Sequence, residues 1–167
     1  MTINRQWLLA ERPSGMVGPH NFEYAETPIP EPKNNEVLVK NLFLSFDPAQ
    51  RNWMVDRKAY LPPVAIGAPM RAASVGQVVD SRHAEYEVGD LVQTTGYWQD
   101  YVVAAPGEGP MGLVKLPPGV SPEMMLSVLG ITGLTAEKGC DGSAAGVKPH
   151  GDSLKLVSLI AANHEIG

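Results

Sequence analysis

Cysteine is nearly absent from this sequence, and long apolar runs are missing. The one cysteine, Cys140, excludes an internal disulfide and a zinc site built from several cysteines, which agrees with a reducing compartment. No apolar run approaches the ~18 residues that a membrane-spanning helix needs. The apolar patch near the N-terminus is also too short for a signal-peptide core. We therefore expect a cytoplasmic protein.

Clustered positive charge and the common catalytic motifs are missing as well. The formal net charge is −5, and the 13 lysines and arginines are scattered along the chain, which argues against binding to nucleic acid. The four histidines are far apart and form no HExxH or similar spacing of metal ligands. Neither a GxSxG nucleophile turn nor a GxxxxGKS/T phosphate loop occurs. Hydrolase and NTPase functions therefore have little support.

Glycine and proline, in contrast, are abundant, with 17 and 15 residues. They divide the chain into short segments rich in valine, threonine and aromatic residues, which is typical of compact β structure. Strands are expected over residues 36–46, 74–81, 89–96, 98–105 and 113–117. The first has apolar residues at both alternating positions, so we expect both of its faces to be covered for part of its length. Short strands at this spacing predict a small barrel or sandwich.

The clearest helix signal comes late in the chain. Ser121 can cap a helix, Pro122 suits its first turn, and Glu123 complements the positive end of its dipole. Gly130 is placed to end this helix. After it the chain carries one candidate strand, residues 153–160, which would need a sheet to join.

Two segments could carry chemistry. The stretch FLSFDPAQRNWM, residues 43–54, leaves its strand through an Asp-Pro turn and could hold the guanidinium of Arg51 at the rim of a pocket. The alternative is a strand end with a solvated arginine. Tyr97 and Trp98 follow Gly96 and could line an apolar pocket, or could equally plug the end of a barrel.

Taken in order, these segments resemble the medium-chain dehydrogenase/reductase superfamily. The matching stretches are FLSFDPAQRNWM, PMRAASVGQVVDSRHAEYEVGDLV, GYWQDYVV and KLPPGVSPEMMLSVLGITGLTA, which lie in the family's order and spacing between residues 2 and 136. Within the superfamily, the chain looks like the zinc-independent NADP-dependent oxidoreductases related to prostaglandin and leukotriene reductases.

The resemblance implies a mainly β (α+β) fold. A GroES-like β-barrel, residues 1–126, would be followed by a C-terminal helix leading into an incomplete Rossmann segment, residues 127–167. The implied cofactor is NADPH, and the implied substrate is a small α,β-unsaturated ketone or aldehyde that receives a hydride at its β-carbon. Since a hydride needs no protein nucleophile, the protein's part is to orient the nicotinamide and polarise the carbonyl.

The same resemblance points to individual residues. The candidate catalytic residues are Asp47, Arg51 and Tyr97, and the candidate cofactor-binding residues are Pro48, Ile131 and Thr135. No metal is expected, because the positions at which zinc-dependent members carry a His-Glu pair and a cysteine hold Ala72, Ala73 and Ile131 here. Family members commonly have a tyrosine where this chain has Ala49, which alters the expected substrate pocket.

The C-terminal part departs from the family. Where members have a glycine loop that cups the cofactor pyrophosphate, this chain reads AANHEIG, with His164 in place of a glycine and Glu165 beside the expected phosphates. Both changes oppose pyrophosphate binding, because a side chain blocks close approach of the backbone and a carboxylate repels phosphate. We therefore expect a truncated or altered cofactor domain and a chain that is inactive by itself.

Two other interpretations stay open. The chain could be a non-enzymatic GroES-like module that binds a full-length relative or forms a homo-oligomer. Alternatively, the sequence after Ala136 could be a frameshifted or alternatively spliced end.

Overall fold

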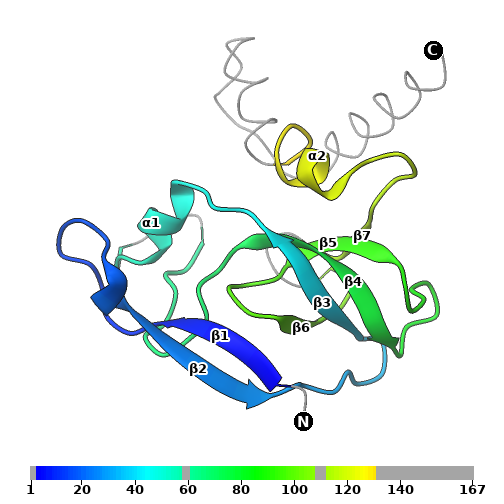
Figure 1. Ribbon diagram of the computed structural model, residues 1–167, viewed down its shortest axis with the longest axis horizontal. Coiled ribbons are helices and arrows are strands. Elements are labelled where there is room, and N and C mark those ends of the chain that lie inside the picture. Colours follow the sequence, from blue (N-terminus) through cyan, green and yellow to red (C-terminus); the bar gives the residue numbers. More distant parts are fainter. Residues whose placement is uncertain (1–2, 58–60, 108–111, 131–167) are drawn as a thin grey trace. The chain divides into compact units, whose positions relative to one another are not determined.

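Valine-rich strands form the larger of two sheets in the computed structural model, which describes residues 3–57, 61–107 and 112–130 (Figure 1). The larger sheet is antiparallel and has the strand order β6-β3-β4-β5-β7. Its strands are β3 (Val37–Leu44), β4 (Ala73–Ser81), β5 (Leu91–Thr95), β6 (Tyr101–Ala104) and β7 (Val114–Lys115). Five of the six strands predicted from the sequence are therefore confirmed, with bounds shifted by a few residues, and the sixth, residues 153–160, lies outside the described residues.

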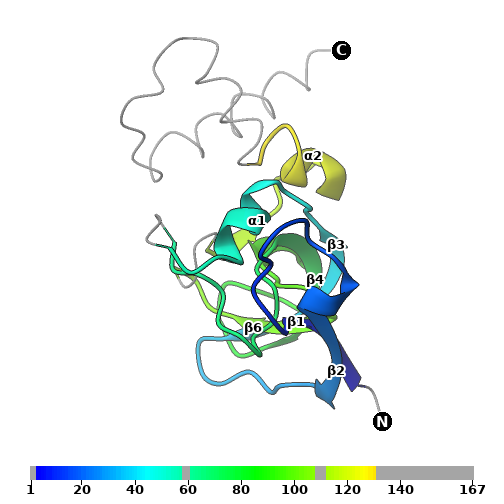
Figure 2. The same ribbon diagram turned by 90° about the vertical axis from the view of Figure 1, so that its left-hand side faces the viewer.

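A two-stranded ribbon precedes the larger sheet in the chain. Its strands, β1 (Ile3–Leu9) and β2 (Phe22–Pro28), pair antiparallel, and the short helical turn Pro19–Asn21 lies between them. The edge of β1 that does not pair with β2 forms hydrogen bonds with neighbouring loops. For example, the amide of Trp7 donates to the carbonyl of Trp98 (2.9 Å). Figures 1 and 2 show the ribbon beside the larger sheet.

The described strands form two separate sheets, whereas the sequence predicted a small barrel or sandwich and the resemblance implied a GroES-like β-barrel. Only isolated bridges, Gln6 with Gln99 and Leu8 with Pro69, extend the pairing of the described residues from the ribbon toward the rest of the chain. The prediction of a mainly β, GroES-like fold is confirmed, and the described strands do not close into a single barrel.

Two clusters of buried apolar side chains hold these elements together. The first lies on the larger sheet and consists of Val37, Val39, Val78, Val92, Val102 and Leu113. Val37, Leu38 and Val39 are consecutive in β3 and all buried, which confirms that both faces of this strand are covered over that part. The second cluster joins the ribbon to the loops and consists of Leu9, Trp53, Met54, Val64 and Met70.

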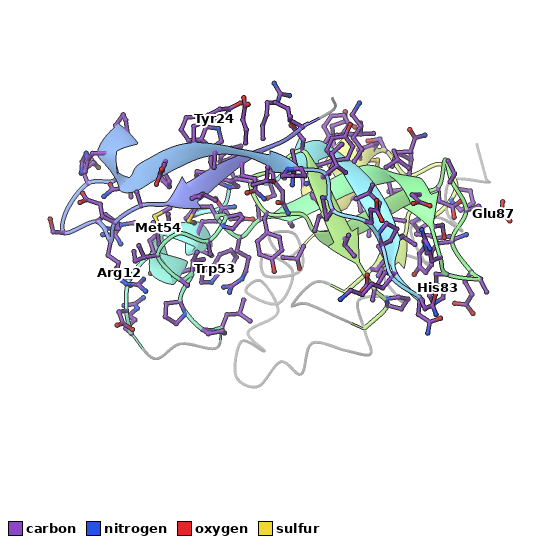
Figure 3. The ribbon with its side chains drawn as sticks, turned by 90° about the horizontal axis from the view of Figure 1, so that it is seen from below. Arg12, Tyr24, Trp53, Met54, His83 and Glu87 are labelled. Carbon is purple, nitrogen blue, oxygen red and sulfur yellow. The ribbon has the colours of Figure 1, made fainter. Side chains whose placement is uncertain are left out.

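An arginine reinforces the second cluster from its edge. Arg12 donates through Nη1 to the carbonyl of Met54 (2.8 Å) and through Nη2 to the carbonyl of Val64 (3.2 Å). Figure 3 shows Arg12, Trp53 and Met54 close together at the ribbon end, with His83 at the opposite end of the larger sheet. The loops around α1 (Ala49–Trp53) are therefore fixed both by apolar packing and by the hydrogen bonds from Arg12 to their backbone carbonyls.

The chain divides into two compact units, Met1–Lys115 and Leu116–Gly167, which are described separately. In the second unit, α2 (Pro122–Leu126) begins as predicted, with the Ser121 hydroxyl accepting from the amide of Met124 (3.3 Å). It ends at Leu126, not at Gly130, because the backbone leaves helical angles at Ser127 (φ −105°, ψ −91°). Among the described residues, no helix is long and apolar enough to cross a membrane. The predicted domain boundary at residue 126 stays a prediction.

The turn between β4 and β5 carries Asp90, which forms an ion pair with Lys115. Gly89 takes a positive φ (103°), which glycine adopts without a steric penalty. The carboxylate of Asp90 accepts from Nζ of Lys115 (2.7 Å) and from the amide of Glu87 (2.8 Å). The hydrogen bond from Lys115, followed by that from the amide of Glu87, holds the pKa of Asp90 below its usual value.

We expect Asp90→Asn to flatten the acid side of the stability profile. A carboxylate whose pKa is lower in the folded state stabilises the fold above its unfolded pKa of about 4, and this contribution is lost as the pH falls through the folded-state pKa. Urea unfolding at pH 7 and pH 3 should therefore show a smaller loss of stability on acidification for Asp90→Asn than for the unchanged chain. Asp56→Asn, at an exposed position, is the control. An equal change in both variants would contradict the assignment.

Candidate functional site

One end of the five-stranded sheet brings together the segments that could carry chemistry. The amide of Ser45, just after β3, donates to the carbonyl of Ala73 at the start of β4 (2.9 Å). The amide of Gly96, just after β5, donates to the neighbouring carbonyl of Ala72 (3.0 Å). The Asp-Pro turn after β3 and the glycine turn after β5 therefore leave the sheet at the same end.

Asp47 and Pro48 form the turn from β3 into α1. The Ser45 hydroxyl donates to Oδ2 of Asp47 (2.8 Å), and the amide of Gln50 donates to the carbonyl of Asp47 (3.0 Å). The side chain of Gln50 reaches back to the carbonyl of Ser45 (2.8 Å). Pro48 already has helical angles (φ −56°, ψ −27°), which suits its fixed ring. These bonds set the direction in which the Asp47 side chain leaves the sheet.

Arg51 lies in α1, and the chain itself engages its guanidinium. Nη2 donates to the carbonyls of Pro13 (3.3 Å) and Gly15 (3.1 Å), both in the loop between β1 and β2. The sequence left open a pocket-rim arginine or a solvated one, and the structure shows a third arrangement, in which Arg51 anchors this loop. Its catalytic role stays a prediction.

Tyr97 and Trp98 are held in a turn by Asn41. Nδ2 of Asn41 donates to the carbonyls of Gly96 (2.9 Å) and Gln99 (2.8 Å), which bracket the two aromatic residues. Tyr97 has a positive φ (56°), packs against the first core cluster and so closes the end of the sheet. Trp98 instead lines a groove. Trp98 therefore follows the pocket-lining alternative drawn from the sequence, whereas Tyr97 packs on the core of the sheet.

The groove lies along the ribbon and has a volume of about 770 Å³. The five aromatic side chains that line it are Trp7, Phe22, Tyr24, Phe46 and Trp98. The ring centroids of Trp98 lie 5.1 Å from Phe22 and 5.2 Å from Phe46. Trp7 and Tyr24, which are register partners in the ribbon, meet edge to face at 5.5 Å. These separations are those of favourable aromatic pairs, so the walls of the groove support one another.

The groove has one polar stretch. Nε of Arg5 donates to Oδ2 of Asp100 (2.6 Å), and Nη2 of Arg5 donates to Oδ1 (3.2 Å). The hydrogen bond and then the charge of Asp100 raise the pKa of Arg5. The two charges oppose each other in a bidentate pair, so this stretch presents N–H donors and carboxylate oxygens side by side without a net charge.

The predicted site residues divide into two groups. Asp47, Pro48, Arg51 and Tyr97 lie at the sheet end described above. Ile131 and Thr135 lie outside the described residues. The catalytic and cofactor-binding roles of all six stay predictions.

The ribbon and the side chains that it adds to the groove were not predicted from the sequence. Trp7, Phe22 and Tyr24 come from β1 and β2, which were not predicted. A signal was present, because Phe22 and Tyr24 alternate with the charged Glu23 in a proline-bounded segment.

No metal centre can be built from the described ranges. Within them, no group of three or more His, Cys, Asp or Glu side chains gathers as metal ligands would. Ala72 and Ala73, at two of the positions where zinc-dependent relatives carry ligands, offer only backbone groups at the start of β4. The prediction that the chain holds no metal still rests on residue identity.

Comparison with known proteins gives the site its context. A model of the family described as the N-terminal domain of oxidoreductase matches residues 5–113. The chain belongs to this family. It is 40% identical over 137 residues to the NADPH-dependent curcumin reductase of Escherichia coli (strain K12), which covers 81% of this chain and 39% of that protein. It is 31% identical over 140 residues to prostaglandin reductase 1 of Mus musculus, with the same coverage, 81% and 39%.

Solved structures of a relative agree with this placement. CurA from Vibrio vulnificus is 42% identical, superposes with a TM-score of 0.72, and is matched over 81% of this chain and 39% of that one. A second structure of CurA, in complex with NADPH, is 41% identical with a TM-score of 0.70. These relatives confirm the resemblance to the prostaglandin reductase branch of the medium-chain dehydrogenase/reductase superfamily. The chain spans about 39% of the length of the curated relatives named here.

Proposed function

We propose that this chain forms the substrate-side part of an NADPH-dependent reductase that delivers a hydride to the β-carbon of an α,β-unsaturated ketone or aldehyde. The observation that carries the proposal is its 40% identity, over 81% of the chain, to an NADPH-dependent curcumin reductase. The sheet end with Asp47, Arg51 and Tyr97 supports it, because three separate segments converge there on a fixed scaffold.

The described residues do not fit NADPH by themselves. The groove walls are aromatic, and Arg5 in its lining is already paired with Asp100, so a charged pyrophosphate gains little there. In the sequence, His164 and Glu165 stand where a glycine loop would approach that pyrophosphate. We therefore propose that the 167 residues alone neither bind NADPH tightly nor reduce an enone.

Two preparations test this proposal. The first is the chain itself, for which calorimetry with NADPH should show no micromolar binding, and NADPH should not be consumed when an α,β-unsaturated ketone is added. The second is a chimera in which this chain replaces the matching N-terminal part of the E. coli curcumin reductase. We expect the chimera to oxidise NADPH only when the ketone is present.

The controls separate failure of folding from failure of the proposal. The remainder of the E. coli reductase, without any N-terminal part, should be inactive. A chimera that binds NADPH and unfolds cooperatively but reduces no enone would contradict the substrate-side assignment. Micromolar NADPH binding by the chain alone would contradict the second half of the proposal.

The alternative of a binding or oligomerisation module makes a different prediction. It requires the chain to associate with itself or with a longer relative, which light scattering measures directly. A strictly monomeric chain that ignores the relative would count against this alternative. The cytoplasmic location predicted from the sequence also stays a prediction.

A further inference from the structure

The groove along the ribbon exposes more aromatic surface than the fold needs. Phe46 is 74% exposed, Trp7 47% and Tyr24 46%. Exposed aromatic residues that gather on one concave surface, rather than lying scattered, are typical of a binding site. The groove volume of about 770 Å³ lies in the range of small-molecule sites, about 300 to 1,000 Å³.

The ring geometry favours a flat ligand. Phe22 and Phe46 both contact Trp98, with centroid separations of 5.1 and 5.2 Å, and their planes are tilted by 39° and 49° to it. An added planar ring can therefore meet these walls in the offset or edge-to-face arrangements that aromatic pairs prefer. Aliphatic chains would bury similar area without this directional contribution.

The polar stretch of the groove selects against charge. A carboxylate or an ammonium placed there would meet both Arg5 and Asp100, so attraction and repulsion largely cancel and the lost hydration of the charged group is not offset. A neutral hydroxyl avoids this penalty, because its oxygen can accept from the guanidinium while its hydrogen is donated to the carboxylate. The polar stretch is thus complementary to one hydroxyl group.

We propose that this groove binds small, neutral, planar aromatic molecules that carry a hydroxyl group, with the rings against Phe46 and Trp98 and the hydroxyl at the Arg5–Asp100 pair. Binding needs neither a cofactor nor hydride transfer. It therefore does not rest on the proposed reductase function, and either proposal can fail while the other holds.

Titration of the full chain with 2-naphthol, at pH 7, tests the proposal. Naphthalene probes the rings alone, 2-naphthoate adds an anion, and calorimetry gives each affinity. We expect 2-naphthol to bind more tightly than both. The tryptophan side-chain N–H signals in NMR locate the site, since Trp7 and Trp98 line the groove and Trp53 belongs to the second core cluster. The signals of Trp7 and Trp98 should move and that of Trp53 should stay.

Two phenylalanines on the same segment supply a matched pair of variants. Phe46→Ala should weaken binding of 2-naphthol about tenfold, the factor that corresponds to losing one aromatic contact with its buried area. Phe43→Ala should leave it unchanged, because Phe43 is also exposed (39%) but does not line the groove. Asp100→Asn should reduce the preference for 2-naphthol over naphthalene, without weakening naphthalene itself.

Several results would overturn the proposal. These are equal losses in the Phe46 and Phe43 variants, a shift of the Trp53 signal as large as that of Trp98, and binding of 2-naphthoate as tight as that of 2-naphthol. Binding of a proline-rich peptide with no response to 2-naphthol would also overturn it, by assigning the aromatic groove to a protein partner. Since Phe46 and Phe43 are both exposed, far-UV circular dichroism should show that each variant folds.

Discussion

Gly96→Ala is expected to lower the free energy of unfolding by about 1 to 3 kcal/mol, the usual cost of overfilling a packed interior. A Cβ at this position would overlap the Ser74 side chain and would lie 2.6 Å from Oδ1 of Asn41. Ser74 is fully buried in β4 and cannot move aside without disturbing the sheet. Since Asn41 also holds the turn that carries Tyr97, the substitution should loosen the candidate site as well.

Urea denaturation of three variants checks this expectation. Gly15→Ala is the matched control, because nothing lies within 4 Å of a Cβ there, and it should change the midpoint little. The pair Gly96→Ala with Ser74→Gly should cost less than the sum of the two single changes, because the second removes the atoms that the first would strike. A Gly96→Ala variant as stable as Gly15→Ala would show that the sheet end is not packed as described.

The larger sheet could be predicted from the sequence because its strands carry their own signals. Val37, Leu38 and Val39 form a continuous β-branched and apolar run, and Gly89 with Asp90 marks a tight turn. These local features agree with the structure, so each strand was found with small errors at its ends. The helix end at Leu126 was missed because the residue types around Ser127 do not mark the point at which its backbone leaves helical angles.

The ribbon could not be predicted so easily, because its first strand buries a polar residue. Asn4 is 2% exposed. Its Nδ2 donates to the carbonyl of Tyr101 (3.1 Å), and its Oδ1 accepts from the amide of the same residue (2.9 Å). The side-chain amide of Asn4 thus makes with Tyr101 the pair of hydrogen bonds that the backbone of a neighbouring strand would otherwise make. In the sequence, this asparagine interrupts the apolar alternation, and the partner that satisfies it lies in β6, far along the chain.

The candidate site shows the same division. The Asp-Pro turn and the Gly96 turn were evident from residue types, and the structure places both at one end of the sheet. The partners of Arg51, two backbone carbonyls in the β1–β2 loop, have no side-chain signature at all. The groove joins side chains from the ribbon, the end of β3 and the turn after β5, so it exists only once the register of the ribbon is known.

Leu9→Ala is expected to have the largest effect on the fold, a loss of about 2 to 5 kcal/mol in the free energy of unfolding. Leu9 is fully buried in the second core cluster, against side chains such as Trp53 and Met70. Neighbouring side chains cannot move in to fill the space left by the leucine, because the strand is held in place by backbone hydrogen bonds. The amide of Leu9 donates to the carbonyl of Ala68 (2.9 Å), and the amide of Gly67 donates to the carbonyl of Leu9 (2.8 Å). The substitution therefore leaves a cavity beneath the loops that carry α1.

Thermal and urea unfolding of a short series on β1 tests this prediction. Leu9→Met keeps the volume and should cost less than about 1.5 kcal/mol. Ile3→Ala removes a similar side chain from the same strand at a position that is 39% exposed, and it should cost clearly less than Leu9→Ala. The order Leu9→Ala, then Leu9→Met and Ile3→Ala, follows from the cavity alone. Equal losses of stability for Ile3→Ala and Leu9→Ala would contradict the prediction. They would show that the second cluster does not join the ribbon to α1.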